Sequence, residues 1–370
     1  MKTTIPHCLL FVFLSIVYGS TVARAEIMVG IAGDLSGSQL TSGEQQEIGA
    51  LKAIDHLNEK GGLLGETIVA ISADDACKPE QAKAVARQMV SEGVVLVIGH
   101  ICSGSSLAVS ETYEEAGIIM ISPGSTNPKV TDEGGNNVFR VIGRDDQQGR
   151  MAGDYLADNR SKKNIAIMHD STAYSQGLAE LTKKQLNKRG VAEELFDSYM
   201  PDQRDYQSIA DKLLNYKIDV LYAAGAEADI GILLRQTKKV LPKLVLFSGD
   251  GLVSPNFMVI AGEAGEGTYF TFGPDIRLNR EARKIVAAIR EEEAYEPDGY
   301  TLYSYGAVQA WAQAVQKAGS FKSDAVIKAL KSGSFDTVLG RIGFDEKGDV
   351  TGINTFVWYV YGKETYSLVK

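Results

Sequence analysis

The feature that most constrains the fold is a regular alternation of short apolar runs with longer amphipathic segments. Val94–Ile98 reads VVLVI, which is typical of a strand buried on both faces. Residues 44–58 carry apolar side chains at helical spacing, and Gly61-Gly62 ends that pattern. The order strand, helix, strand, helix predicts a parallel sheet with right-handed crossovers. The same reasoning predicts strands at Ile27–Ile31, Thr67–Ala73 and Ile118–Ile121, and helices at Pro79–Ser91 and Ser103–Glu115.

The alternation restarts after Arg144, which predicts a second unit of similar construction. Helices dominate from Arg280 to Lys331, before short strands near Ile342–Phe344 and Phe356–Tyr361. A length of 370 residues suits about two domains, and no low-complexity linker separates them, so we expect several chain crossings between the halves. The expected strands of the second unit are Asn164–Met168, Val220–Ala224, Leu244–Phe247 and Gly267–Phe272, and its expected helices are residues 145–159, 175–189, 206–215 and 230–240.

Residues 1–25 have the pattern of a secretory signal peptide. Lys2 precedes a short apolar core, Cys8–Tyr18, and Ala23-Arg24-Ala25 is a small-x-small cleavage site. We therefore expect removal after Ala25 and export to the periplasm. Losing Lys2 and Arg24 lowers the net charge from −9 to −11, which disfavours binding to nucleic acid or to anionic lipid.

Cys77 and Cys102 are the cysteines that remain after cleavage. In an oxidising compartment they most simply form one disulfide. No metal or cofactor motif occurs, and no nucleophile elbow or Walker loop, so we expect neither metal nor cofactor. His100 and His169 each follow a strand, where a structural role is commoner than a catalytic one. A secreted hydrolase using either histidine stays open as an alternative.

Two loops after predicted strands are rich in small and hydroxyl residues: residues 99–106 and 122–128. The first opens a helix, where free N–H groups and Ser103 favour an anion such as a carboxylate. Simple helix capping and an ordinary turn are the alternative interpretations. Glu227 and Asp250 follow strands of the second half and could receive an ammonium group. Together these features indicate a zwitterionic ligand.

At these residues the chain resembles the periplasmic substrate-binding proteins of amino-acid ABC transporters, in particular the leucine/isoleucine/valine-binding type. The resemblance covers essentially all of residues 26–370 and is specific because its motifs occur in order at matching separations. The motifs are I-x-V-G-I-A-G-D-L-S-G (Ile27–Gly37), N-E-K-G-G (Asn58–Gly62), D-D-A-C (Asp74–Cys77), V-I-G-H-I-C-S-G-S-S (Val97–Ser106), M-I-S-P-G-S-T (Met120–Thr126) and F-D-E-K-G-D (Phe344–Asp349).

The resemblance implies an α/β fold of two Rossmann-like lobes with parallel sheets, joined by a three-strand hinge and closing on ligand. Lobe one would comprise residues 26–143 and 275–350, and lobe two residues 144–274 and 351–370. The family's disulfide falls on Cys77 and Cys102.

The resemblance also implies roles for individual residues. Ser103 and Thr126 would hold the ligand carboxylate. The carbonyl of Gly124, the Thr126 hydroxyl and Asp250 would hold the ammonium, with Glu227 as an additional acid; leucine-type members usually carry Glu at the position of Asp250. The expected pocket walls are Tyr174, Tyr300, Ile101 and Ser125.

Two departures affect the expected ligand. Ser42 and Ala226 stand where leucine-type members carry aromatic residues, which weakens the case for a large aliphatic side chain. A branched-chain amino acid and a proline, alanine or γ-aminobutyrate ligand both remain open. The partners implied are an ABC permease with its ATPase, or a membrane receptor if the role is sensory. We expect a monomer.

Overall fold

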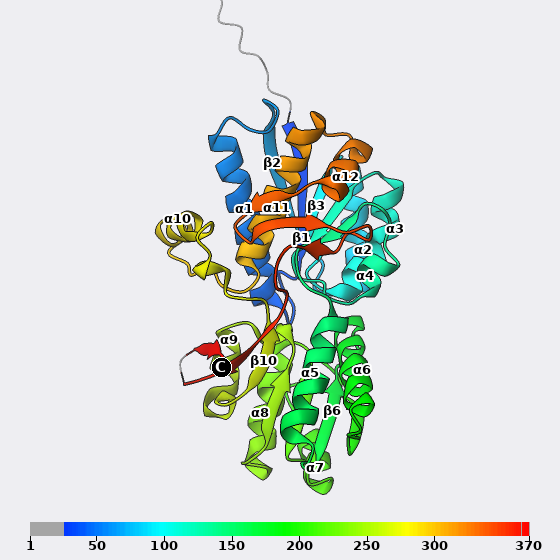
Figure 1. The fold of residues 1–370 in the computed structure, drawn as a ribbon, viewed down its shortest axis with the longest axis vertical. Helices are drawn as coiled ribbons and strands as arrows, with labels where there is room; N and C mark the ends of the chain where they lie inside the picture. The colour runs from blue at the N-terminus through cyan, green and yellow to red at the C-terminus, as the bar shows by residue number, and fades with distance from the viewer. Residues whose placement is uncertain (1–25, 364, 370) are drawn as a thin grey trace, which may run out of the picture.

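The computed structural model describes residues 26–363 and 365–369, so the predicted signal peptide lies outside the described residues. The upper lobe in Figure 1 is built on a parallel sheet of strand order β2-β1-β3-β4-β5. Strand β1 pairs Val29 with Ala70 of β2 on one side and with Leu96 of β3 on the other. The strands are β1 (Glu26–Gly33), β2 (Thr67–Asp74), β3 (Leu96–Gly99), β4 (Ile119–Ser122) and β5 (Val138–Arg140).

Helices from both ends of the chain cover this sheet. Near the N-terminus these are α1 (Leu40–Glu59), α2 (Pro79–Ser91), α3 (Ser103–Glu115) and α4 (Lys129–Asp132). From the later part come α11 (Thr301–Ala318) and α12 (Ser323–Ser332), with a small antiparallel sheet of β11 (Phe335–Thr337), β12 (Gly340–Phe344) and β13 (Val350–Thr351). The segment before α11 forms η3 (Ile276–Leu278) and α10 (Arg283–Glu293), and α10 lies to the side of the lobe (Figure 1). Gly49 lets α1 and α11 approach closely, because a Cβ there would lie 2.0 Å from the Thr301 carbonyl oxygen.

The lower lobe is a second sheet of order β15-β14-β10-β9-β8-β6-β7 (Figure 1). Strands β6 to β10 run parallel, and the C-terminal strands add antiparallel pairs at one edge. The strands are β6 (Ile165–His169), β7 (Leu195–Ser198), β8 (Val220–Ala224), β9 (Val245–Ser248), β10 (Tyr269–Phe272), β14 (Val357–Tyr361) and β15 (Tyr366–Leu368). The helices are α5 (Asp145–Arg160), α6 (Ala173–Lys188), α7 (Gln207–Asn215), α8 (Glu227–Val240), η1 (Asp250–Leu252), α9 (Asn256–Ala261) and η2 (Gly262–Gly265).

Within residues 26–363 the chain passes between the two sheets three times: from β5 to α5, after β10, and from β13 to β14. The predicted α/β class with two lobes and crossing strands is therefore confirmed. The predicted lobe boundaries at 143/144, 274/275 and 350/351 stay a prediction, because sheet membership does not show which residues move together. No helix in the described part of the chain is long and apolar enough to span a bilayer.

The structure adds five short strands that the apolar pattern did not predict: β5, β7, β11, β13 and β15. β5 has three residues and is too short to show periodicity, and β7 is a partly exposed edge strand. Helix α1 begins at Leu40 rather than Glu44, because the Asp34 carboxylate accepts the backbone N–H of Gln39 at 2.8 Å and turns the chain into the helix.

Candidate functional site

A cleft of about 420 Å³ lies where the carboxyl ends of the two sheets face each other. In open α/β sheets this is the edge at which ligands bind. The cleft-lining residues follow β1 to β4 of the first sheet and β6 to β9 of the second, with one aromatic residue from the start of α11. They are Ser38, Gln39, Ser42, Ala76, Cys77, Lys78, Pro79, Ile101, Cys102, Ser103, Gly104, Gly124, Asp170, Ser171, Thr172, Ala173, Tyr174, Pro201, Asp202, Ala226, Asp250, Gly251 and Tyr300.

The lobe-one wall is formed by the start of α3 and the loop after β4. Ser103 is the first residue of α3, and its Oγ accepts the Asn127 backbone N–H at 3.2 Å. Its own hydroxyl proton is then available to a ligand, next to the unpaired N–H groups of the helix start. Gly124 must lack a side chain, because a Cβ would lie 2.3 Å from Cδ1 of Ile101. This wall thus offers neutral donors suited to a carboxylate.

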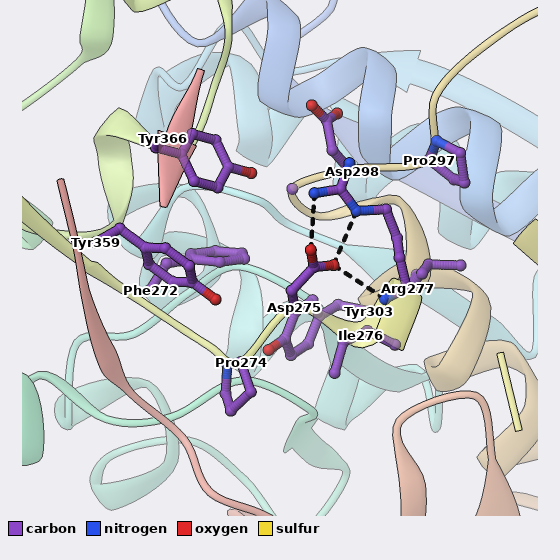
Figure 2. A pocket seen from close by; sticks show the side chains of 12 residues that line it. Phe272, Pro274, Asp275, Ile276, Arg277, Pro297, Asp298, Tyr303, Tyr359 and Tyr366 are labelled. Atoms are coloured by element: carbon purple, nitrogen blue, oxygen red, sulfur yellow. Dashed lines mark hydrogen bonds and ion pairs between the residues drawn. The ribbon is translucent and has the colours of Figure 1, made fainter. Parts of the chain in front are cut away.

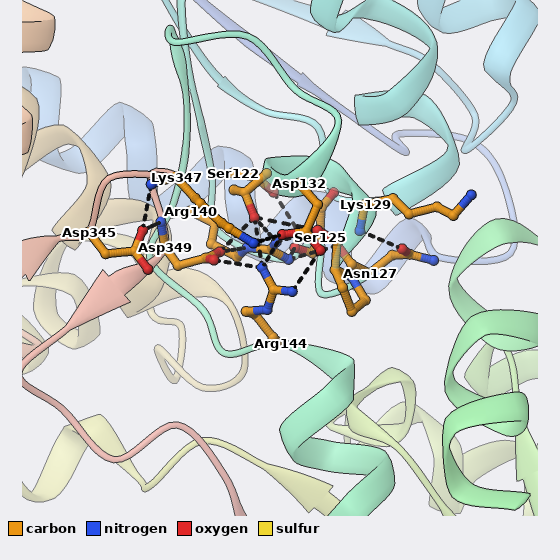
Figure 3. A network of polar contacts seen from close by, with 12 residues as sticks. Ser122, Ser125, Asn127, Lys129, Asp132, Arg140, Arg144, Asp345, Lys347 and Asp349 are labelled. Carbon is orange, nitrogen blue, oxygen red and sulfur yellow. Dashed lines mark hydrogen bonds and ion pairs between the residues drawn. The ribbon is translucent and has the colours of Figure 1, made fainter. Parts of the chain in front are cut away.

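A buried arginine holds the loop after β4 in place (Figure 3). Arg140 is fully buried, and its guanidinium donates to the carbonyl oxygens of Ser125 at 3.0 Å and Asn127 at 2.9 Å. Its Nε lies 2.6 Å from Oδ1 of Asp349, which compensates the charge. The Asp349 carboxylate also meets Arg144 at 2.7 Å. The loop that carries Gly124 is therefore fixed from behind by an ion-pair network.

The lobe-two wall carries a buried carboxylate. Asp250 Oδ1 accepts from the Tyr174 hydroxyl at 2.9 Å, and Oδ2 accepts from the Tyr300 hydroxyl at 3.0 Å. Burial raises the pKa of Asp250, while its hydrogen bonds from Gln148, Tyr174 and Tyr300 oppose that rise. Tyr300 comes from the segment before α11 and Asp250 from the end of β9, so this contact joins the two lobes across the cleft.

Gln148 and Asp145, at the start of α5, were not predicted from the sequence. Gln148 Nε2 donates to Oδ1 of Asp250 and to Oδ1 of Asp145, each at 2.9 Å. Asp145 is fully buried, and both burial and the Asp250 charge raise its pKa well above the usual range. The sequence analysis predicted only a helix at residues 145–159, and the fold brings its first turn against Asp250.

Most of the predicted site residues come together in this cleft. Ser103, Gly124, Ile101, Tyr174, Tyr300 and Asp250 line it, and so do Ser42 and Ala226. Their contact with a ligand remains a prediction.

Three predicted residues do not line the cleft. The Ser125 hydroxyl instead bonds Oγ of Ser106 at 2.8 Å and the His100 carbonyl at 2.9 Å. Thr126 is fully buried beside Asp145, and its hydroxyl has no hydrogen-bond partner among the described residues. Glu227 begins α8 and turns toward Asn256, whose Nδ2 lies 3.2 Å away.

Neither candidate histidine lines the cleft. His100 is completely buried, where Nδ1 contacts Asp75 and Nε2 lies 3.0 Å from the Tyr113 hydroxyl. His169 Nδ1 accepts the Ser171 backbone N–H at 3.1 Å, and burial lowers its pKa. Both arrangements are those of structural residues, and neither brings a serine or cysteine nucleophile to the ring.

The predicted disulfide is confirmed: Cys77 and Cys102 are bonded, with their Cα atoms 5.4 Å apart. Both residues line the cleft. The bond ties the loop after β2 to the start of α3 and so fixes the position of Ser103.

A second cavity, of about 20 Å³, lies beside the crossing after β10 (Figure 2). Its volume suits a water molecule and not an amino acid. Arg277 Nε and Asp275 Oδ1 lie 2.8 Å apart at its edge. Burial raises the pKa of Asp298 there to about 6, against the opposing charge of Arg277. This cavity belongs to the hinge region and not to the ligand cleft.

Two lobes with opposed sheet ends, a cleft between these ends and hydrogen bonds across it define a bilobal binding protein. The chain belongs to the periplasmic binding protein family, whose model matches residues 26–361. A Leu/Ile/Val-binding protein homolog of Brucella suis is 43% identical over 328 residues, covering 88% of each chain. An amino-acid-binding protein of Pseudomonas aeruginosa is 40% identical over 343 residues, covering 92% of this chain and 91% of that protein. The crystal structure of a leucine-binding protein from Thermotoga maritima superposes with a TM-score of 0.84 at 24% identity, covering 93% of this chain and 98% of that one. This last likeness supports the fold.

Proposed function

We infer that this protein captures a small amino acid between its lobes. The observation that carries the proposal is the chemistry of the two cleft walls. Ser103 and the start of α3 offer neutral donors to a carboxylate. Asp250 presents a buried carboxylate to which no cationic side chain of residues 26–363 or 365–369 is bonded. A ligand with an acid at one end and an ammonium at the other satisfies both walls at once. The sequence relatives named as amino-acid-binding proteins support this proposal.

The ligand class is a small amino acid of the leucine, isoleucine and valine group. Ser42 and Ala226 lie in the cleft wall and leave room next to polar side chains. Because each buried CH₂ contributes only about 0.8 kcal/mol, a wall with Ser and Ala in place of two aromatic side chains discriminates weakly between aliphatic side chains. Proline, alanine and γ-aminobutyrate are the alternative ligands.

Binding and closure are coupled through Tyr300 and Asn127. Tyr300 of lobe one donates to Asp250 of lobe two, and Asn127 Nδ2 donates to the Ala173 carbonyl at 2.6 Å. In our proposal the ligand docks first on Ser103 and Gly124. Lobe two then closes over its ammonium, and the added contacts favour the closed state. Thr126, behind this wall, would complete the site by orienting its hydroxyl toward the ligand.

Family membership indicates that the protein acts outside the cytoplasm. We propose that it acts in the periplasm, after the signal peptide has been cleaved behind Ala25. The closed form would act as a monomer and deliver its ligand to an ABC permease driven by an ATPase. A sensory role would use the same cleft but a different membrane partner. Growth on the identified amino acid after deletion of this protein separates the two roles, because only a transport protein is needed for uptake itself.

The test of the proposal is a thermal-shift and calorimetry panel on the mature chain. The ligands are leucine, isoleucine, valine, alanine, proline and γ-aminobutyrate. Two matched controls lack one charged end: 4-methylpentanoate has no amine, and isopentylamine has no carboxylate. We expect a clear rise in Tm with at least one amino acid and none with either control. Equal binding of 4-methylpentanoate would overturn the assignment of the acidic wall.

A further inference from the structure

Behind the Asp250 carboxylate lies a second buried carboxyl, Asp145, and one amide joins the two. Both Oδ1 atoms accept from the same Gln148 nitrogen at 2.9 Å, so they lie within about 6 Å of each other. Asp145 and Asp250 are each no more than 1% exposed. Two carboxylates this close, out of water, cannot both ionise freely.

The orientation of the Gln148 amide is fixed by its other end. Its Oε1 accepts the Asp250 backbone N–H at 3.0 Å and also meets the Thr271 hydroxyl. A backbone N–H can only donate, so the Nε2 group must be the donor toward both carboxyl groups. Neither Oδ1 can therefore donate a proton in that bond, and the two Oδ2 atoms are the sites that this amide leaves open for a proton on the pair.

The two Oδ2 atoms differ. Oδ2 of Asp250 accepts from the Tyr300 hydroxyl at 3.0 Å, and its Oδ1 receives a second donor from Tyr174 at 2.9 Å. Oδ2 of Asp145 accepts no geometrically well-formed hydrogen bond among the described residues, and the hydroxyl of neighbouring Thr126 lies close enough to oppose the rise in the pKa of Asp145. The donors thus stabilise charge on Asp250, and the vacant oxygen of Asp145 is the place for a proton.

Other charged and titratable groups around the pair do not supply a compensating cation. Arg140 lies nearby, but it pairs with Asp349 at 2.6 Å. Tyr174, Tyr222, Tyr300 and Tyr303 surround the pair, and burial keeps each phenol neutral by raising its pKa. The charge of the pair is left to be balanced by a proton or by a ligand.

We propose that Asp145 is a proton-holding positioning residue: one proton on its Oδ2 keeps the pair at a single negative charge, and the ligand ammonium displaces that proton on binding. This inference rests on the proposed role of Asp250 as the ammonium partner. The proton leaves to solvent, and the pair then carries two negative charges against one positive charge. Since binding releases protons, affinity rises with pH through the range in which Asp145 ionises.

The ligand-free test is carbon NMR of protein labelled at the aspartate carboxyl carbons, titrated from about pH 4 to 8 across the ordinary carboxyl range. The resonance absent from Asp145→Asn should keep the shift of a protonated acid after the exposed aspartates have ionised. Exposed Asp146, assigned from Asp146→Asn, is the matched reference. If the Asp145 resonance titrates together with Asp146, the proposal is overturned whether or not any amino acid binds.

The ligand test is calorimetry with L-leucine or, if leucine gives no heat, L-alanine, at one pH in phosphate and in Tris. The binding enthalpy should differ between the buffers because protons are released, and Asp145→Asn should abolish the difference. Asp145→Ala should bind about tenfold more weakly than Asp145→Asn, because Ala leaves the Gln148 donor unpaired. Asp146→Asn should match the wild type. If the binding enthalpy of the wild type were the same in both buffers, the proposal that the ligand displaces a proton would be overturned. If neither amino acid gave a heat of binding with the wild type or with Asp250→Asn, the result would instead count against the proposed function.

Discussion

The two walls of the cleft are built on opposite electrostatic principles. On the lobe-one side the buried charge of Arg140 is compensated by Asp349, and the ligand meets only neutral donors such as Ser103. On the lobe-two side, buried Asp250 and Asp145 have no bonded cation among the described residues, only hydrogen-bond donors. In the first wall the buried charge is balanced without a ligand, whereas in the second wall the ligand supplies the balancing charge. Substitutions in the first wall should therefore reduce stability, and substitutions in the second should reduce binding.

The largest effect should come from Arg140→Met in the compensated wall. It removes one of the two arginines that pair with buried Asp349, leaving only Arg144, and it removes the donors to the Ser125 and Asn127 carbonyls. Breaking a buried pair in this way should lower the free energy of unfolding by about 3–5 kcal/mol in urea denaturation. Arg341→Met is the control, because that side chain is exposed and should change little. Equal stability of the two variants would mean that the network does not hold the wall.

The second prediction concerns Asp250→Asn in the uncompensated wall. Removing this charge should cost about 2–5 kcal/mol of amino-acid binding free energy by calorimetry. The ligand-free variant should not lose stability. Burial raises the pKa of Asp250 in the folded state, so the wild type loses stability as pH rises from the unfolded pKa through the folded one.

The Tm of Asp250→Asn relative to the wild type should therefore increase with pH above the ordinary carboxyl range. Asp146→Asn provides the exposed control, with no such trend. If Asp250→Asn lost stability but kept its affinity for the amino acid, this wall would serve stability rather than binding, and the proposed difference between the two walls would be wrong.

The third prediction is a smaller effect at the rim of the compensated wall. Replacing both Cys77 and Cys102 by Ser should lower the free energy of unfolding by roughly 3 kcal/mol, as expected for a closed loop with a sequence separation of 25. Reductant should lower the Tm of the wild type and leave the double variant unaffected. Indifference of both proteins to reductant would show that the bond contributes no stability.

Sequence patterns located residues at the surface of both walls, but not the charged groups that lie behind them. Ser103, Gly124 and Asp250 follow apolar strands, and that position alone places them at the ligand edge of a sheet. Gln148 and Asp145 gave no such signal, because a polar helix start looks the same whether water or a second sheet covers it.

The limits of pattern reasoning are also plain at Glu227. It follows a strand as predicted, but a strand end does not fix the direction of a side chain, and the start of α8 turns this one toward Asn256. Arg140 was not predicted as part of the wall for a different reason. Its partners lie far from it in the chain, and only the fold brings them together.

The path of the chain has a consequence for synthesis and secretion. The first lobe needs α11 from the late part of the chain, and β14 covers the edge of β10 only once residues 357–361 have been made. A nascent or truncated chain therefore presents an open strand edge, the kind of surface that pairs with other chains and aggregates. Neither lobe can be finished before the last tenth or so of the polypeptide emerges, so the molecule matures as one unit rather than lobe by lobe.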